Sequence, residues 1–136
     1  MKALSIRQPW AWAILHAGKD VENRDWKNPW APSGELLLHA AKGCTAVEFR
    51  EAADVIEGIS GRRPPPLDQM RRGGIVGAFR IASAVRQEFP TSHWAVPGLV
   101  HLHLVEVRPL PFVELAGQLG FFEVPPAVVV RLLEAP

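Results

Sequence analysis

The chain has 136 residues, which is the length of one domain and enough to bury a core without disulfide or metal support. An apolar fraction of 48% and a charged fraction of 21% exclude wholesale disorder, and a formal net charge of +1 excludes a basic surface over the whole molecule. The single cysteine, Cys44, excludes an internal disulfide, argues against a structural zinc site and suits a reducing cytoplasm.

The apolar run near the N-terminus is too short and interrupted for a membrane span, and no signal-peptide cleavage region follows it. We therefore expect a cytoplasmic protein with no membrane partner, folded as a single domain over residues 1–136.

The first half of the chain alternates short strands and helices. In chain order we predict a strand at 3–7, a helix at 10–16, an extended segment at 21–26, a strand at 35–40 and an amphipathic helix at 45–57. Pro9 suits the first turn of the first helix, and Gly18 follows its end. Thr45 and Glu48 match a capping box at the start of the second.

The second half begins with an arginine-rich, proline-rich loop at 58–74. After it we predict a strand at 74–85, a strand at 99–107, a turn or short helix at 112–119 and a helix from 126 to 133. Pro109 and Pro111 are expected to end the second of these strands. His101 and His103 share one of its faces, which we interpret as the solvent face.

About five strands and three or four short helices at irregular spacing predict an α+β fold. The sheet is expected to be mainly antiparallel and strongly curved, forming a small barrel. The missing strand–helix alternation argues against a doubly wound sheet. Because two histidines on one strand do not define a metal site, we expect no metal and no cofactor.

Polar chemistry concentrates between residues 5 and 26, where three tryptophans accompany charged side chains. Glu22 and Arg24 stand two apart in an extended segment, so they project to the same face, just after Lys19. A guanidinium fixed in this way can bind a phosphate or a base edge, and a tryptophan face can stack on a base. The alternative is a surface ion pair beside core tryptophans.

These residues resemble the ASCH domain family, named for the activating signal cointegrator-1 homology region. The resemblance rests on LSIRQPWA at 4–11, GKDVENR at 18–24 and GELLLHAAK at 34–42. Lys19, Glu22 and Arg24 match the family signature Gly-x-Lys-x-x-Glu-x-Arg, whereas Ala17 replaces its first glycine. The resemblance implies a PUA-like fold, a curved β-barrel with helices at its side, and binding of RNA or another nucleic acid.

The resemblance also implies a cleft lined by the signature residues. Besides those three, the ligand-binding residues it suggests are Gln8 and Trp10 from the QPW element, Trp26 after the signature, and His39 on the following strand. For His39, a hydrogen-bonded role inside the barrel is the alternative.

The leading functional hypothesis is therefore a module that binds RNA, another nucleic acid or a nucleoside derivative. The arginines of the 58–74 loop are a possible addition to the contact surface: Arg62, Arg63, Arg71 and Arg72. A protein partner, with the apolar segment 121–133 as its surface, is a third hypothesis.

The alternative class is a metal-independent hydrolase acting on RNA or on an acylated nucleobase. Glu22 would be the base, with Lys19 and Arg24 stabilising the developing charge. One branch of the family is similar to an amidohydrolase of N4-acetylcytidine, in which the signature lysine activates a threonine three residues later. Glu22 occupies that position here, so the nucleophile is missing. A Glu22 engaged in ion pairs would also be a weak base.

Overall fold

The computed structural model describes residues 1–89 and 92–134. The strands in this part are β1 (Lys2–Ile6), β2 (Val21–Arg24), β3 (Leu36–Ala40), β4 (Gly74–Arg86), β5 (Val100–Glu114) and β6 (Phe121–Glu123). The α-helices are α1 (Trp10–His16), α2 (Ala46–Ser60) and α3 (Pro126–Glu134), and a 3-10 turn, η1, covers Leu67–Gln69. No described helix is long and apolar enough to cross a membrane.

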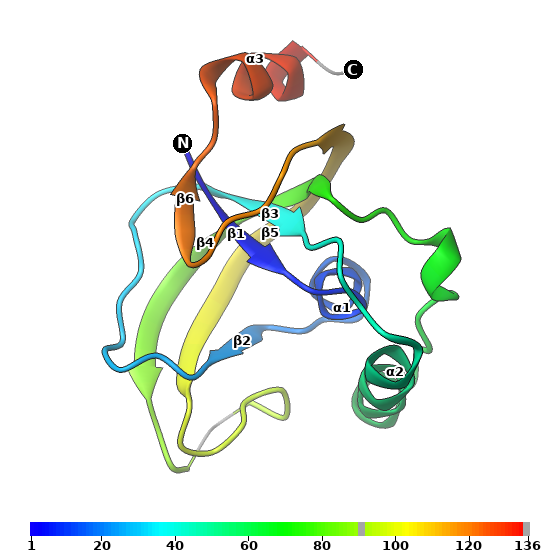
Figure 1. Cartoon of the computed structure of the whole chain (residues 1–136). Helices are drawn as coiled ribbons and strands as arrows, with labels where there is room; N and C mark the ends of the chain where they lie inside the picture. Colours follow the sequence, from blue (N-terminus) through cyan, green and yellow to red (C-terminus); the bar gives the residue numbers. More distant parts are fainter. Residues whose placement is uncertain (90–91, 135–136) are drawn as a thin grey trace.

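The six strands form one sheet in the order β2-β5-β4-β3-β1-β6. Only β1 and β3 pair in parallel, so the prediction of an α+β fold with a mainly antiparallel sheet is confirmed. The long strands β4 and β5 bend strongly (Figure 1). Their pairing shifts register three times, and Glu106 has a φ of 52°, as expected where bulges bend a strand.

The expected barrel does not close through backbone hydrogen bonds. The edge strands β2 and β6, of four and three residues, do not pair with each other in the described sheet. Side chains span the space instead. Arg24 on β2 donates to the carbonyl of Ser5 on β1 at 2.8 Å. The Trp26 ring lies edge-on to Phe121 of β6, with ring centroids 5.5 Å apart.

The prediction that Pro109 and Pro111 end the fifth strand is wrong, and so is the turn or helix expected from residue 112. Strand β5 continues to Glu114. Beyond His103 it pairs with β4 alone, because β2 reaches only its first four residues. An edge strand tolerates proline where the missing N–H faces away from the neighbouring strand.

The assignment of His101 to the solvent face is also wrong, because this side chain is fully buried. The loop at 92–99 covers it: the His101 Nε2–H donates to the carbonyl of Val96 at 2.6 Å. Asn23 on β2 fastens the same loop by donating to the Trp94 carbonyl and accepting from the Val96 N–H.

Both faces of the sheet are covered, which explains why every residue of β3 is buried. Alternate side chains of a strand point to opposite faces. Leu36 and Leu38 accordingly pack in one cluster with Ile14 of α1, whereas Leu37 packs in a second cluster with Leu132 of α3. Figure 1 shows α3 at one end of the molecule, apart from α1 and α2.

The capping box predicted for α2 is confirmed. The Glu48 N–H donates to the Thr45 hydroxyl at 3.1 Å, and the Thr45 N–H donates to the Glu48 carboxylate at 2.9 Å. The helix runs three residues beyond the expected end and stops at Gly61, which adopts a φ of 74°. Glycine adopts this left-handed conformation without steric cost.

The close approach between the start of β4 and the end of β5 depends on a glycine. A Cβ at Gly74 would lie 2.4 Å from the Val113 carbonyl oxygen and 2.6 Å from the Phe112 ring. Because a backbone oxygen cannot rotate away, Gly74→Ala should lower the free energy of unfolding by about 1–3 kcal/mol. Gly58→Ala is the control: its Cβ would meet nothing within 4 Å on α2, so the variant should be stabilised. Urea unfolding of both variants measures the difference, and equal stability would contradict the close approach.

Candidate functional site

The end of helix α1 places Lys19 inside the protein. Gly18 adopts a φ of 74°, which turns the chain back, and the Lys19 N–H donates to the Ala13 carbonyl at 3.1 Å. The chain then enters β2 at Val21, and Lys19 is buried, with only 3% of its surface exposed. Burying an ammonium group is costly unless it is paired and hydrogen-bonded.

Lys19 meets that requirement through three contacts. Its Nζ donates to the carbonyl of Val21 and to Oε1 of Glu22, the latter at 2.9 Å. The same ammonium group lies 5.6 Å from the centroid of the Trp10 ring, within the range of a cation–π interaction.

The second carboxylate oxygen of Glu22 accepts a hydrogen bond from Arg24. The Arg24 Nε donates to Oε2 of Glu22 at 3.1 Å, which confirms that the two side chains share a face of β2. The guanidinium carbon lies 5.6 Å from the centroid of the Trp26 ring. Glu22 is therefore held between two cations, and this network of Lys19, Glu22 and Arg24 carries one net positive charge.

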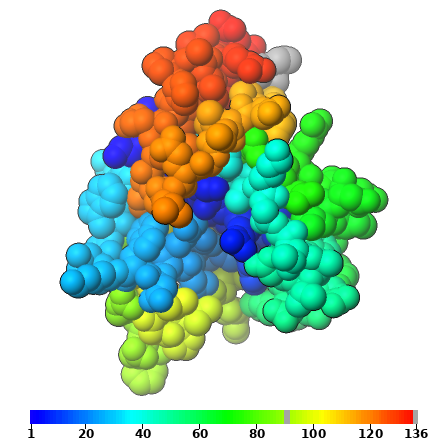
Figure 2. Space-filling model, in the orientation of Figure 1, coloured from blue at the N-terminus to red at the C-terminus, as the bar shows by residue number. Residues whose placement is uncertain are grey.

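The network borders an open hollow of about 390 Å³, which we call the signature cleft. Trp10, Glu22 and Arg24 line it, together with Ser5, Ile6, Arg7, Asn23, Ala41, Gln118, Leu119 and Gly120. In Figure 2, dark-blue atoms of the N-terminal segment lie at the bottom of a recess between orange, light-blue and cyan segments.

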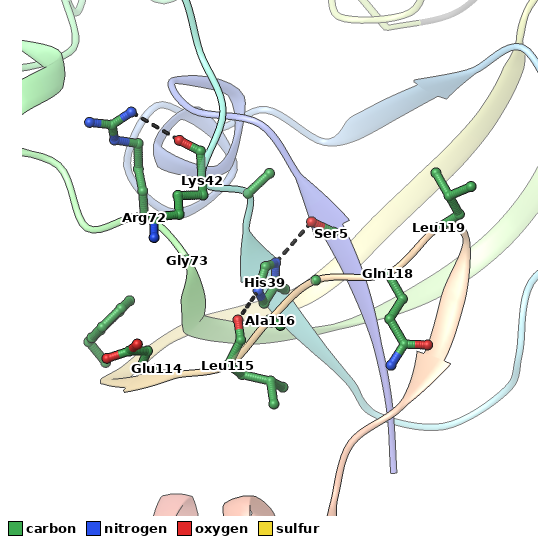
Figure 3. Close-up of a pocket in the computed structure, with 13 residues that line it drawn as sticks. Ser5, His39, Lys42, Arg72, Gly73, Glu114, Leu115, Ala116, Gln118 and Leu119 are labelled. Carbon is green, nitrogen blue, oxygen red and sulfur yellow. Dashed lines mark hydrogen bonds between the residues drawn. The ribbon is translucent and has the colours of Figure 1, made fainter.

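A second, larger hollow of about 750 Å³ adjoins the cleft. Ser5, Ala41, Gln118 and Leu119 line both hollows, so the two are neighbours. Figure 3 shows Ser5, His39 and Leu115 joined by hydrogen bonds in the larger one, with Arg72 bonded to the carbonyl of Lys42 beside them. We call it the His39 hollow.

The structure thus brings together only some of the predicted ligand-binding residues. Gln8 lies outside the cleft, because its amide donates to the Arg71 carbonyl and accepts from the Trp12 N–H. Trp26 supports Arg24 and is not among the residues that line the cleft. His39 faces the adjoining hollow and is hydrogen-bonded as well, which combines the two roles considered for it.

The arginines of the 58–74 loop are dispersed. Arg62 donates to the His16 carbonyl, and Arg63 pairs with Asp54 and Glu57 on α2. Arg71 stacks on the Phe112 ring, so Arg72 alone of the four lines the His39 hollow. The loop does not form one basic patch beside the cleft.

Cys44 lies just before α2 but is not activated. Burial, and secondarily the charge of Glu48, raise the pKa of its thiol above the ordinary value. A reactive cysteine needs the opposite shift, because the thiolate is the nucleophile. Among the described residues, no group of three histidine, cysteine or acidic side chains is placed to hold a metal ion.

Part of the site carries no clear signal in the sequence. Ser5 stands inside the LSIRQPWA motif but outside the Lys-x-x-Glu-x-Arg signature, and the loop between β5 and β6 is far from both in the chain. Gly117 in this loop is the one local signal. A Cβ there would lie 2.8 Å from the His39 ring.

The ASCH domain family model matches residues 4–96, so the chain belongs to the ASCH domain family. Its fold is similar to the crystal structure of ASCH from Zymomonas mobilis, with a TM-score of 0.56 and 11% identity over 97% of this chain and 92% of that one. The crystal structure of a mutant form of the Zymomonas mobilis protein gives a TM-score of 0.57 and 11% identity over 97% and 95%. No curated protein matches the chain significantly.

Removing the negative charge between Lys19 and Arg24 should destabilise the fold. Glu22→Gln leaves a buried ammonium group without its counter-charge, at a cost of about 3–5 kcal/mol. Glu57→Gln is the matched control, because the Arg63–Glu57 pair is exposed and should contribute less than about 1 kcal/mol. Denaturant unfolding compares the two variants. Equal losses would show that the buried network does not stabilise the protein.

Proposed function

We propose that this ASCH domain binds RNA, or a nucleotide-derived ligand, in the signature cleft. The observation that carries the proposal is a fixed, net-positive network of Lys19, Glu22 and Arg24 at an open cleft walled by Trp10. The family resemblance, which implies nucleic-acid binding, supports the same conclusion. We extend the proposal to residues 1–136 as one domain acting in the cytoplasm.

Arg24 is the principal donor to the ligand in this proposal. A guanidinium has five N–H donors, and within the described residues Arg24 uses one for Glu22 and one for Ser5. Those two bonds fix its plane. The remaining donors are available for a phosphate or a base edge, and a pre-oriented fork loses little entropy on binding.

The His39 hollow extends the positive surface. Lys42 and Arg72 line it, although Glu114 is also present. A single-stranded RNA with one base stacked on Trp10 can continue past Ser5. Its next phosphate would then lie near Lys42 and Arg72. Few phosphates are neutralised in this arrangement, which agrees with the net charge of +1.

The geometry favours binding over hydrolysis by Glu22. Both carboxylate oxygens already accept charged hydrogen bonds, from Lys19 and from Arg24. The two bonds engage Glu22 as the partner of both cations and hold its carboxylate in one position. Glu22 therefore serves better as the holder of two cations than as a base that must reach a substrate proton.

Substitution of Trp10 should weaken RNA binding without unfolding the protein. Trp10→Leu keeps apolar bulk but removes the stacking face, so the affinity for a short single-stranded RNA should fall about 5- to 150-fold. Trp12→Phe is the matched control, because Trp12 lies on the same helix but lines another hollow. Fluorescence quenching of the remaining tryptophans gives the affinity of each variant.

The same titration at rising salt tests the contribution of phosphate. For two phosphate contacts on a single strand, the slope of log K against log salt is about −1.4. Affinity that is independent of salt, or equal losses in the two tryptophan variants, would contradict binding of RNA in the cleft.

A further inference from the structure

We propose that Ser5 and His39 form a nucleophile–base pair that transfers the acyl group of an ester. The Ser5 hydroxyl lies 2.9 Å from Nδ1 of His39, and Nε2 of the same ring lies 2.6 Å from the Leu115 carbonyl oxygen (Figure 3). A carbonyl oxygen can only accept, so Nε2 carries the proton. In the neutral ring, Nδ1 is then the acceptor, and Ser5 donates its hydroxyl hydrogen to it.

The pair is held rigidly. His39 is 1% exposed and lies on β3, whereas Ser5 lies opposite it on the parallel strand β1. A nucleophile, a base in hydrogen-bond reach and a third group that orients the base are the parts that activate a serine. Here the third group is the Leu115 carbonyl, from a segment far along the chain.

Ser5 is also accessible, because it lines both the signature cleft and the His39 hollow. The loop after β5 comes close to it: a Cβ at Gly117 would lie 3.0 Å from the Ser5 hydroxyl oxygen. Within the described residues the backbone N–H groups of Gly117 and Gln118 donate to no protein acceptor. These two N–H groups belong to the segment that approaches Ser5, and the proposal assigns to them the stabilisation of the oxyanion formed there.

The reaction balances with water as the only co-reactant. The Ser5 oxygen bonds to the ester carbonyl carbon while its proton moves to Nδ1 of His39. The bond from that carbon to the alcohol oxygen then breaks, and His39 returns the proton to the departing alcohol. Water attacks the acyl-serine, gives a proton to His39 and releases the carboxylic acid, and the proton goes back to the Ser5 oxygen.

The surroundings select an ester rather than an amide. The neutral Leu115 carbonyl orients the ring but stabilises an imidazolium less than a carboxylate would, which suits a good leaving group. Phe112, Leu115 and Leu119 in the His39 hollow can accept the acyl part. The alcohol part would occupy the signature cleft, and its assignment as a nucleoside rests on the function proposed above.

The test uses reagents that need no ligand in the cleft. The full chain is treated with a small ethyl fluorophosphonate and with p-nitrophenyl acetate, and the modified serine is located by peptide mass spectrometry. We expect one phosphonyl group on Ser5, none on the exposed Ser83 and an ester hydrolysis activity lost in Ser5→Ala. His39→Gln should slow the labelling of Ser5 about 100-fold, the contribution of a general base.

A second variant keeps the test decisive if His39→Gln does not fold. In Ser5→Cys, the introduced thiol should react with iodoacetamide about 10-fold faster than Cys44, the pKa of which is raised by burial.

The failures of the two proposals are distinguishable. An unlabelled Ser5 in a folded chain that binds RNA, or labelling that is unchanged in folded His39→Gln, would overturn the acyl-transfer proposal alone. A labelled Ser5 in a chain that binds no RNA would support the pair and overturn the assignment of the cleft.

Discussion

The structure depends on one buried carboxylate held between two cations. Glu22 on β2 binds Lys19 with one oxygen and Arg24 with the other. A buried ion pair does not by itself guarantee stability, but it fixes geometry because neither charge can be left alone. Arg24 then reaches across the curled sheet to the Ser5 carbonyl on β1. The same interaction therefore joins two strands that do not pair and builds one wall of the signature cleft.

The cleft follows from the way in which the sheet curls. Bulges bend β4 and β5, and the edge strands β2 and β6 each pair with one neighbour and not with each other in the described sheet. Side chains connect the segments that the backbone leaves unpaired. Trp26 packs on Phe121 of β6, and Arg24 of β2 donates to the Ser5 carbonyl of β1. An incompletely paired barrel therefore leaves polar groups at its opening.

Local signals in the sequence predicted local features well. The helix after Pro9, the capping box of α2 and the shared face of Glu22 and Arg24 each depend on residues a few positions apart. Features that depend on distant partners were not predictable in this way. The continuation of β5 through Pro109 depends on where β2 stops pairing, and the burial of His101 depends on a loop that folds over it.

The backbone and the side chain of Ser5 make separate contacts, so this one residue can serve both of the functions proposed above. In a strand the carbonyl lies along the plane of the sheet, whereas the side chain stands away from it. The Ser5 carbonyl accepts from Arg24, and its hydroxyl pairs with His39. In the functions proposed above, a ligand that binds Arg24 lies beside the Ser5 hydroxyl, because one residue carries both contacts. The partners of Ser5 come from β2, β3 and the segment after β5, so the arrangement exists only once the sheet has curled.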